Sequence, residues 1–341
     1  MPRRLLTLMT LLTPMAVAGA GEATYQQGVV FDQYPNWSSR AELVRRLASP
    51  LDARRVLREA SAAGRGPGGQ TIDLANERFV LRVPVDAPPA GYALLVFISP
   101  WQDAKLPSRW APALDHHGMI FVSAANTGNA AGDLDRREPL ALIAAANVMK
   151  RYRVDPDHVY IGGFSGGARV AMRLALGYPD VFRGALLNAG SDPIGDEVPP
   201  PPADLFRRFQ DSTRLIYMTG AHDDFHLAAD GSSRHSMETW CVFDLDTETA
   251  PRIGHEPADP ATLDDALDAL ATHRPADHDR LAACRARVAG EMSEQLKAVQ
   301  DLLAGGRSAD ALTLLKTVDR RYGGLAAPQS LDLADRLEVP R

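Results

Sequence analysis

One serine in this 341-residue chain stands on a turn that few folds can build. The apolar run Val159–Gly162 leads directly into a Gly-x-Ser-x-Gly sequence at residues 163–167, and a helix is expected from Ala168 to Leu176. A serine on such a sharp strand-to-helix turn needs small neighbours, because a Cβ beside it would collide with the strand or the helix. The sequence therefore predicts a strand, a tight turn at Ser165 and a helix.

The neighbours of Ser165 suit a nucleophile. Gly163 and Gly167 leave the room that the turn requires. The start of the following helix offers free backbone N–H groups and a positive dipole end to negative charge that develops during attack on a carbonyl. The five-residue pattern also occurs by chance in structural loops, so its interpretation depends on partner residues elsewhere in the chain.

Apolar runs and helix-like segments alternate through the middle of the chain. Continuous apolar runs favour buried parallel strands, and their alternation with helices favours a mostly parallel sheet covered on both faces. A hydrophobic content of 45% is sufficient for such a core. Strands are expected within 71–83, and at 92–98, 119–122, 159–162, 184–187, 215–219 and 240–245; helices are expected at 139–152, 168–176, 203–209 and 261–270.

Four segments are expected. They are a signal peptide at 1–20, an N-terminal helical preamble at 24–68 with a helix over 42–64, an α/β domain at 69–275, and a C-terminal helical extension at 276–341. In the extension, two helices at 280–303 and 308–322 joined by a Gly-Gly break predict an antiparallel pair, followed by a third helix at 330–337. We expect the extension to pack on the main domain, with docking of a partner protein as an alternative role.

The N-terminus has the pattern of a cleavable secretory signal. Arg3 and Arg4 precede the apolar stretch Leu5–Ala18, and Ala-x-Ala sequences end at Ala18 and Ala20. An exported protein, periplasmic or extracellular, is therefore expected, with no membrane association after cleavage. The formal charge of −6 is spread along the chain without a basic run, which argues against nucleic-acid binding.

Cys241 and Cys284 are the only cysteines. In an oxidising compartment an even number of two permits one disulfide. Two buried thiols that pack as small hydrophobic side chains are the alternative.

Ser165 needs a base, and the base needs an acid that orients it. In serine hydrolases with a strand-turn-helix nucleophile these follow in the order serine, acid, histidine. Here Asp223 follows the apolar run Leu215–Met218, and His255 lies in a loop just before an expected helix. Both positions are at strand ends, where ligands of a parallel sheet converge.

In this order, the Ser165 turn, Gly220-x-x-Asp223 and Gly254-His255-x-x-Pro257 resemble the α/β-hydrolase fold. The stretch 154–160 that leads into the serine turn is similar to the secreted polyhydroxybutyrate-depolymerase-like and feruloyl-type esterases. The resemblance covers roughly residues 70–273. It implies Ser165 as nucleophile, His255 as its base and Asp223 as the orienting acid, with Asp224 as the alternative acid.

The resemblance also implies an oxyanion hole with two N–H donors. Gly166, directly after the serine, supplies the first. Many relatives carry His-Gly after an early central strand, whereas this chain has Ser99-Pro100-Trp101 there. Pro100 has no N–H, so Trp101 is expected to be the second donor.

These residues predict an exported serine hydrolase that cleaves small-molecule or polymeric carboxylic esters through an acyl-enzyme and needs no cofactor. A serine peptidase of the same fold is the alternative enzyme. A catalytically silent hydrolase-like protein that binds a partner through its helical tail is the alternative from another class.

Other polar and aromatic residues have competing interpretations. A metal site at His222, Asp223, Asp224 and His226 is disfavoured, because no helix is expected to organise the four and the aspartate already serves His255. His116 and His117 are expected to be surface residues. Trp101 and Trp110 are expected either to line the acyl pocket or simply to pack against other side chains. Residues 191–204, which include four consecutive prolines, are expected to form a short lid or none.

Overall fold

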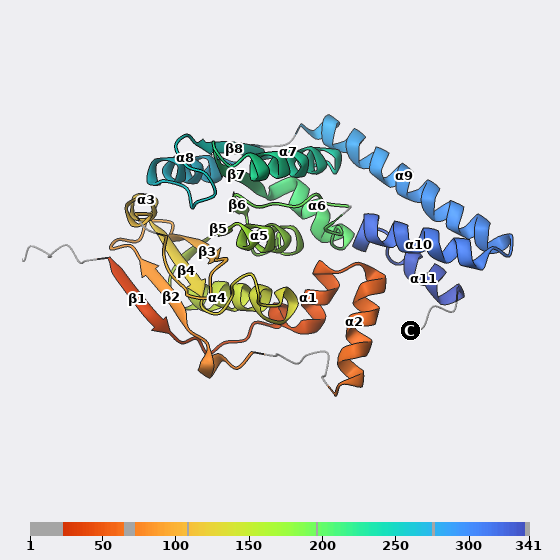
Figure 1. Ribbon diagram of the computed structural model, residues 1–341, viewed down its shortest axis with the longest axis horizontal. Coiled ribbons are helices and arrows are strands. Elements are labelled where there is room, and N and C mark those ends of the chain that lie inside the picture. The colour runs from red at the N-terminus through yellow and green to blue at the C-terminus, as the bar shows by residue number, and fades with distance from the viewer. Residues whose placement is uncertain (1–22, 65–71, 108, 196, 275–276, 338–341) are drawn as a thin grey trace, which may run out of the picture.

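The computed structural model describes residues 23–64, 72–107, 109–195, 197–274 and 277–337. The expected signal peptide lies outside these residues. A central sheet with helices on both faces forms the body of the molecule, and the C-terminal helices lie at one end of it (Figure 1). No helix of the described part of the chain has the length and apolar character required to cross a bilayer.

Eight strands form one sheet. Strand β2 pairs antiparallel with both β1 and β4, and every other neighbouring pair is parallel. The spatial order is β1 (Thr24–Val29), β2 (Phe79–Val83), β4 (Met119–Ala124), β3 (Tyr92–Ile98), β5 (Val154–Phe164), β6 (Gly184–Asn188), β7 (Arg214–Gly220) and β8 (Leu245–Ala250).

The two faces of the sheet bury separate hydrophobic clusters. Along β3, Leu94, Val96 and Ile98 face one cluster while Leu95 and Phe97 face the other, as the alternation of a strand requires. The first cluster includes helices α4 (Glu138–Arg151) and α5 (Gly166–Gly177), and the second includes α3 (Ala111–His116) and α8 (Pro260–Ala271). The expected α/β-hydrolase fold is confirmed by this strand order and these layers.

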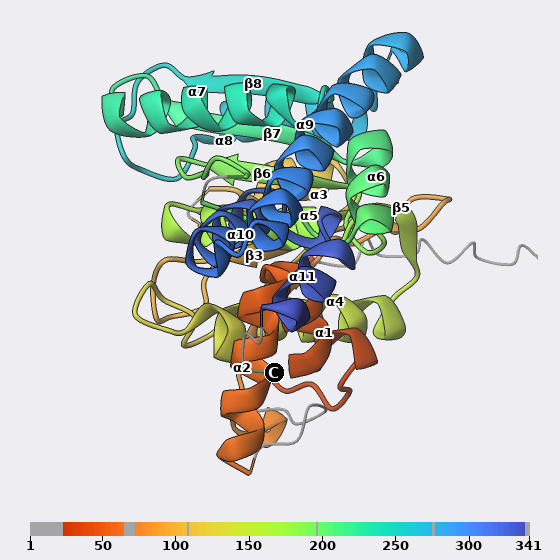
Figure 2. The ribbon, with the colours of Figure 1, turned by 90° about the vertical axis from the view of Figure 1, so that its right-hand side faces the viewer.

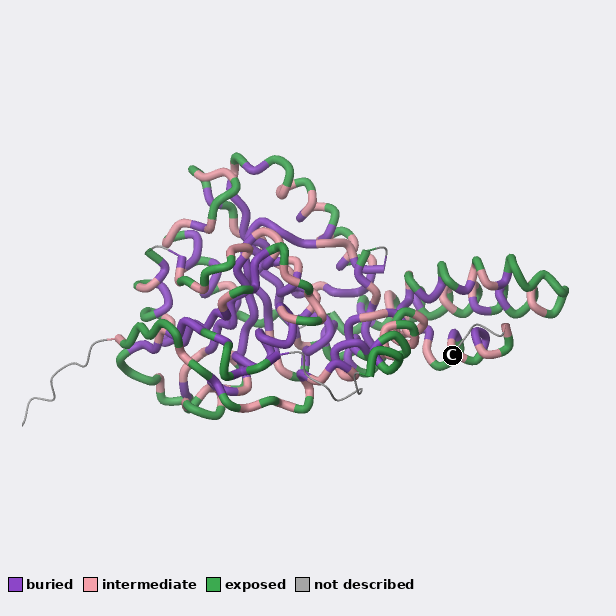
Figure 3. The backbone as a smooth tube through the Cα atoms, turned by 60° about the horizontal axis from the view of Figure 1, so that its bottom comes forward, coloured by how far each residue is buried: buried purple, intermediate pink, exposed green. Residues whose placement is uncertain are grey.

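The parallel strands bring their carboxyl ends to one edge. There the loops that follow β3, β5, β7 and β8 lie next to one another, as expected for the ligand-binding edge of an open α/β sheet. Figure 3 shows that the buried residues gather in the middle of the body of the molecule.

The prediction of a strand at 240–245 is wrong. Residues Asp224–Thr239 form helix α7, and β8 begins only at Leu245. Trp240 is buried because it packs against aromatic side chains of α6 (Ala203–Ser212) and α10 (Ser308–Tyr322), not because it belongs to a strand. Strand β8 is a half-exposed edge strand with a polar sequence, so hydrophobicity does not mark it.

The N-terminal segment is not wholly helical. Strand β1 lies within it and extends the sheet, and the single helix expected over 42–64 is divided into α1 (Arg40–Leu47) and α2 (Pro50–Ala62). Pro50 causes the division, because a proline lacks the N–H that a continuing helix needs but suits the first turn of a new one. Of the strands expected within 71–83, the described residues form β2 only.

The C-terminal extension forms the expected three helices, α9 (His278–Ala304), α10 and α11 (Gln329–Arg336). Figure 2 views the molecule from the side on which they lie. Cys241 and Cys284 form a disulfide that joins the loop before β8 to α9, with Cα atoms 5.7 Å apart. Arg54 of α2 also pairs with Asp335 of α11 at 2.8 Å. The extension is therefore attached to the main body at several points.

Removing the disulfide is expected to destabilise the protein by about 3–4 kcal/mol, because the bond closes a long loop in the unfolded chain. Replacing Cys241 and Cys284 together with alanine should lower the thermal midpoint, and calorimetry measures the change. A reductant should lower the midpoint of the wild type but not that of the variant. Equal midpoints for the oxidised wild type and the variant would contradict this expectation.

Asp319 of α10 is a buried carboxyl group at the contact between the extension and α2. Its carboxylate accepts from the Leu51 N–H of α2 at 3.2 Å, and burial raises the pKa of Asp319 to about 6. The folded state holds the proton more tightly than the unfolded chain, where the ordinary value of 3.8 applies. Stability from this group is therefore lost as the pH rises from about 4 to 6.

The variant Asp319→Asn is expected to be more stable than the wild type at pH 7, by up to about 3 kcal/mol, because it never has to bury a charge. The amide oxygen can still accept from Leu51. Denaturant unfolding at about pH 4.5 and pH 7 measures the effect. The account fails if the difference between variant and wild type is the same at both pH values.

Candidate active site

Ser165 occupies a strained turn between β5 and α5. Its backbone has φ 54° and ψ −125°, a conformation that L-residues rarely adopt. A Cβ added to Gly163 would lie 2.4 Å from the Gly167 carbonyl carbon, and one added to Gly167 would lie 2.0 Å from the Ile98 oxygen. The glycines are therefore required by the close approach of α5 to the ends of β3 and β5.

Ser165, His255 and Asp223 form a chain of hydrogen bonds. The Ser165 Oγ lies 3.0 Å from His255 Nε2, and His255 Nδ1 lies 2.7 Å from Asp223 Oδ2. Asp223 is buried at the first residue before α7, whereas the His255 side chain is 40% exposed. A ligand can thus reach the serine and histidine, while the carboxylate is shielded from water.

Of the two candidate acids, Asp223 contacts His255. Asp224 is exposed and begins helix α7. Burial tends to raise the pKa of Asp223, but hydrogen bonds from His226 and His255 and from the His226 N–H outweigh it and leave this pKa below its usual value. The carboxylate is therefore ionised at neutral pH and can accept a proton-bearing Nδ1 of His255.

His226 is a second histidine on the same carboxylate, and the sequence did not identify it in this role. Its Nδ1 lies 2.8 Å from Asp223 Oδ1, and its ring stacks on the His255 ring with centroids 4.1 Å apart and planes inclined by 9°. Asp223 precedes α7 and His226 lies three residues later in the first turn of that helix, a spacing that puts the two side chains on the same side of the helix. Each oxygen of Asp223 thus has its own imidazole.

The four residues considered as a metal site from the sequence do not come together as one set of donors. His222 and Asp224 are exposed, and the donors that lie close together belong to Asp223, His226 and His255. The expectation that no helix organises this stretch is wrong, because α7 begins at Asp224. An ion that replaced the hydrogen bond between His255 Nδ1 and Asp223 would remove the contact that orients His255 toward Ser165, so we assign these three residues to the hydrogen-bonded chain of Ser165.

The two expected oxyanion donors lie in the loops beside Ser165. Gly166 is the first residue of α5, so its N–H has no partner within the helix. Among the described residues, the Trp101 N–H has no backbone acceptor either. A Cβ on Gly166 would lie 2.3 Å from Asn129 Oδ1, and the Asn129 N–H donates to the Pro100 oxygen at 3.1 Å. Asn129, which the sequence did not single out, therefore contacts both loops.

Aromatic side chains lie beside the serine. The Trp101 ring stacks on Phe164 at 5.7 Å, and Phe164 in turn lies 4.8 Å from the His255 ring. Lys105 Nζ lies 4.6 Å from the Trp101 ring centroid, within cation–π distance. Trp110 is instead part of the core, where it is 1% exposed and its Nε1 donates to the Ala258 oxygen at 2.8 Å. Trp101, and not Trp110, is available to a substrate.

The proline-rich segment at a possible lid position packs on the C-terminal extension. The Pro200 oxygen accepts from the Gly324 N–H at 2.8 Å, and a Cβ on Gly323 would lie 2.3 Å from that same oxygen. The prolines therefore pack against the extension, and a side chain at Gly323 would collide with them.

Comparisons with known proteins give short or distant matches. No protein-family model matches the chain. NocK of Nocardia uniformis subsp. tsuyamanensis, which is named as an esterase, is 49% identical over 53 residues, which are 16% of this chain and 14% of NocK. A poly(3-hydroxybutyrate) depolymerase of Ralstonia pickettii is 28% identical over 98 residues, 25% of this chain and 20% of the depolymerase. The chain thus matches a fifth or less of either relative.

Solved structures with a similar arrangement include esterases and a peptidase. The feruloyl esterase module of Clostridium thermocellum is 14% identical with a TM-score of 0.43, over 59% of this chain and 86% of the module. The acetyl xylan esterase of Aspergillus awamori is 12% identical with a TM-score of 0.43, over 57% of this chain and 94% of the esterase. Dipeptidyl peptidase 4 of Porphyromonas gingivalis is 16% identical with a TM-score of 0.38, over 52% of this chain and 30% of the peptidase. The strand order, rather than these likenesses, identifies the fold.

Proposed function

We propose that this protein hydrolyses carboxylic esters through an acyl-enzyme on Ser165. The observation that carries the proposal is the hydrogen-bonded chain from Ser165 through His255 to the buried Asp223, with the serine held on a strained turn. Strain of this kind persists where the surrounding structure enforces it, which is typical of functional sites. The match to two proteins named as an esterase and a depolymerase supports the same reaction class.

In the first half of the reaction, Ser165 Oγ attacks the ester carbonyl while His255 Nε2 takes its proton. The Asp223 carboxylate holds the other ring nitrogen in the protonated tautomer and stabilises the imidazolium that forms. The negative oxygen of the tetrahedral intermediate would be stabilised by the N–H groups of Gly166 and Trp101. The positive end of α5 adds to this stabilisation.

His255 then gives its proton to the leaving alkoxide, so that the alcohol departs and an acyl-Ser165 ester remains. In the second half, His255 removes a proton from water, the resulting hydroxide attacks the acyl carbon, and the proton returns to Ser165 as the carboxylic acid leaves. The exposed edge of His255 gives water access for this step. The Trp101 and Phe164 rings form the nearby apolar surface against which one side of the ester would pack.

His226 is expected to help catalysis through its bond to Asp223. The variant His226→Phe retains a ring over His255 but removes the donor to Asp223 Oδ1, so we expect kcat/KM to fall by about tenfold, the usual value of one hydrogen bond to a charged group. His226→Asn supplies an N–H donor of similar length and should retain activity within about threefold. Ester hydrolysis by both purified variants measures the difference.

Equal losses in the His226 phenylalanine and asparagine variants would contradict this role. Matching thermal midpoints are the control, because losing a donor that merely stabilised the fold would lower the thermal midpoint as well as the activity. Rescue by asparagine at constant stability would show that the hydrogen bond to Asp223 matters for the reaction.

The proposed reaction is tested by comparing substrates. Initial rates on acetyl, butyryl, hydroxybutyryl and feruloyl esters should exceed the rates on peptide anilides, and a faster anilide reaction would favour the alternative of a serine peptidase. The partial exposure of Ser165 and His255 suits bulky or polar esters, which include small molecules and the ends of polymers.

Export of the protein also remains a proposal. The basic and apolar pattern of residues 1–20 supports it, and so does the Cys241–Cys284 disulfide, because disulfides persist mainly in oxidising compartments. Mass spectrometry of the secreted fraction would find the mature chain beginning after Ala18 or Ala20. Docking of a partner protein by α9–α11 stays a prediction.

A further inference from the structure

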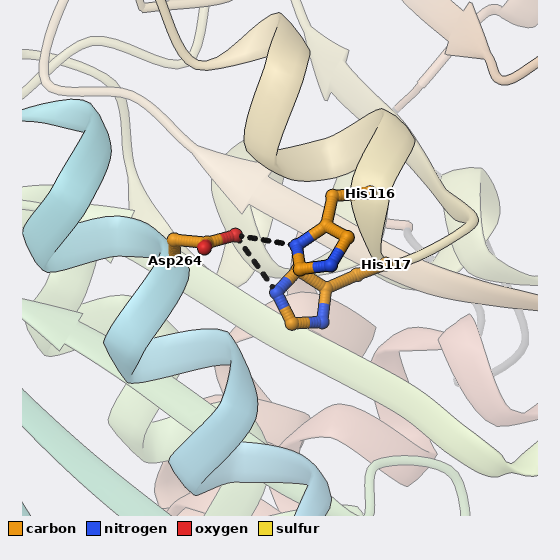
Figure 4. A group of neighbouring side chains, drawn as sticks. All are labelled: His116, His117 and Asp264. Carbon is orange, nitrogen blue, oxygen red and sulfur yellow. Dashed lines mark hydrogen bonds and ion pairs between the residues drawn. The ribbon is translucent and has the colours of Figure 1, made fainter.

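We propose that His116, His117 and Asp264 form a binding site for a divalent transition-metal ion, best suited to Zn²⁺, that joins α3 to α8. The site lies apart from Ser165 and does not depend on the proposed reaction. Figure 4 shows both imidazoles, from the end of α3, directed at a single carboxylate oxygen of α8.

The donor atoms converge closely. His116 Nδ1 lies 3.0 Å and His117 Nε2 3.1 Å from Asp264 Oδ1, and the three donors lie within 4.8 Å of one another. Donors of a tetrahedral Zn²⁺ with bonds of about 2.0–2.1 Å are about 3.3 Å apart. A bound ion would thus need Asp264 Oδ1 to move slightly away from the two rings and the two ring nitrogens, which lie up to 4.8 Å apart, to approach each other. The exposed His116 side chain can make this adjustment.

The chemistry of the donors indicates the class of ion. Two imidazoles and one carboxylate suit Zn²⁺ and neighbouring transition metals, whereas Ca²⁺ and Mg²⁺ prefer oxygen donors alone. The fourth position of the ion would be open to water. The largely buried ring of His117 limits the approach from one side.

A second carboxylate supports His117. The other ring nitrogen, Nδ1, lies 4.0 Å from Asp268 Oδ1, one helical turn beyond Asp264. Metal-binding imidazoles are commonly held by a carboxylate on the nitrogen opposite the metal, which fixes the tautomer and the ring orientation. At 4.0 Å the contact with Asp268 is electrostatic rather than a hydrogen bond, and a small rotation of the exposed Asp268 side chain would bring it within bonding distance of Nδ1.

The charge of α8 also favours a cation. This helix carries Asp264, Asp265 and Asp268 and has no lysine or arginine. The nearby acid of α3, Asp115, is already paired with Arg82 at 2.5 Å. Positive charge placed between α3 and α8 would therefore stabilise both the carboxylates and the contact between the helices.

An ion at this position would connect the two loops beside the candidate active site. The loop that contains Trp101 runs into α3, and the loop that contains His255 runs into α8. The starts of the two helices are already joined by the hydrogen bond from Trp110 Nε1 to the Ala258 oxygen. The metal would join them again further along, at His116 and His117.

Isothermal titration of Zn²⁺ into the untagged, EDTA-treated protein tests the site. We expect one equivalent to bind with a Kd in the micromolar range or below, and saturating Zn²⁺ to raise the thermal midpoint by about 3–6 °C. Co²⁺ should give the visible absorption of a four-coordinate ion. Asp264→Asn should weaken binding at least about tenfold, and Asp268→Asn should weaken it severalfold.

His226→Asn is the matched control, because it disrupts the other cluster of histidine and aspartate donors at Asp223. This variant should bind Zn²⁺ as the wild type does. The proposal is overturned if no stoichiometric binding occurs below about 100 μM, or if Asp264→Asn and the double variant His116→Ala/His117→Ala bind Zn²⁺ as tightly as the wild type. If instead His226→Asn alone loses binding, the metal binds at Asp223 and the proposal is wrong.

Discussion

Replacing Ser165 with alanine is expected to lower kcat for a short-chain nitrophenyl ester by about 10⁵- to 10⁶-fold, as removal of the nucleophile does in serine hydrolases that work through a triad. The only atom removed is Oγ, which accounts for the bond of 3.0 Å to His255. The remaining turn and oxyanion donors would leave a small residual rate. Steady-state kinetics with thoroughly washed protein measures the change.

The matched control for Ser165→Ala is the stability of the variant. Because Ser165 is only partly buried, loss of its hydroxyl should move the thermal midpoint by no more than about 2 °C. A variant that keeps more than about a hundredth of the wild-type kcat would show that the ester is cleaved without this nucleophile.

Replacing Asp223 with asparagine is expected to lower kcat by about 10⁴-fold. An amide N–H at the position of Oδ2 would face the Nδ1–H of His255, so the ring would turn or adopt the tautomer that cannot accept the serine proton. The loss corresponds to about 5.4 kcal/mol of transition-state stabilisation.

Asp224→Asn is the control for Asp223→Asn, because it makes the same chemical change at the neighbouring acid, which was the alternative partner of His255. The exposed Asp224 should lose less than about threefold in kcat. If Asp224→Asn is the more damaging change, the assignment of the orienting acid is wrong.

The central part of the fold was predictable because its strands are buried. Four of them, β3, β4, β6 and β7, are short continuous apolar runs, the pattern of a buried parallel strand. The Ser165 turn marks where β5 ends and α5 begins. Strands β1 and β8 were missed, since they lie at the two edges of the sheet and carry polar side chains. The apolar residues at 240–243 were taken for a strand because burial against α6 and α10 has the same local pattern.

Within the candidate site, the order of the motifs led to Ser165, His255 and an acid at Asp223 or Asp224, and the structure brings Asp223 into hydrogen-bond contact with His255. Their catalytic roles remain predictions. His226 and Asn129 were not recognised, because their positions depend on how one loop packs against another. For Trp110 the sequence left acyl-pocket lining and simple packing open, and its burial beside Phe97 decides for packing.

The most direct test of the proposed function is intact-protein mass spectrometry after exposure to a fluorophosphonate. We expect wild-type protein to gain one phosphonyl group within minutes, with the modified peptide containing Ser165, and the Ser165→Ala variant to gain none. Asp224→Asn should react as the wild type does, while Asp223→Asn should react far more slowly. Folded wild-type protein that remains unmodified, or a Ser165→Ala variant that is modified at the same rate, would contradict the account.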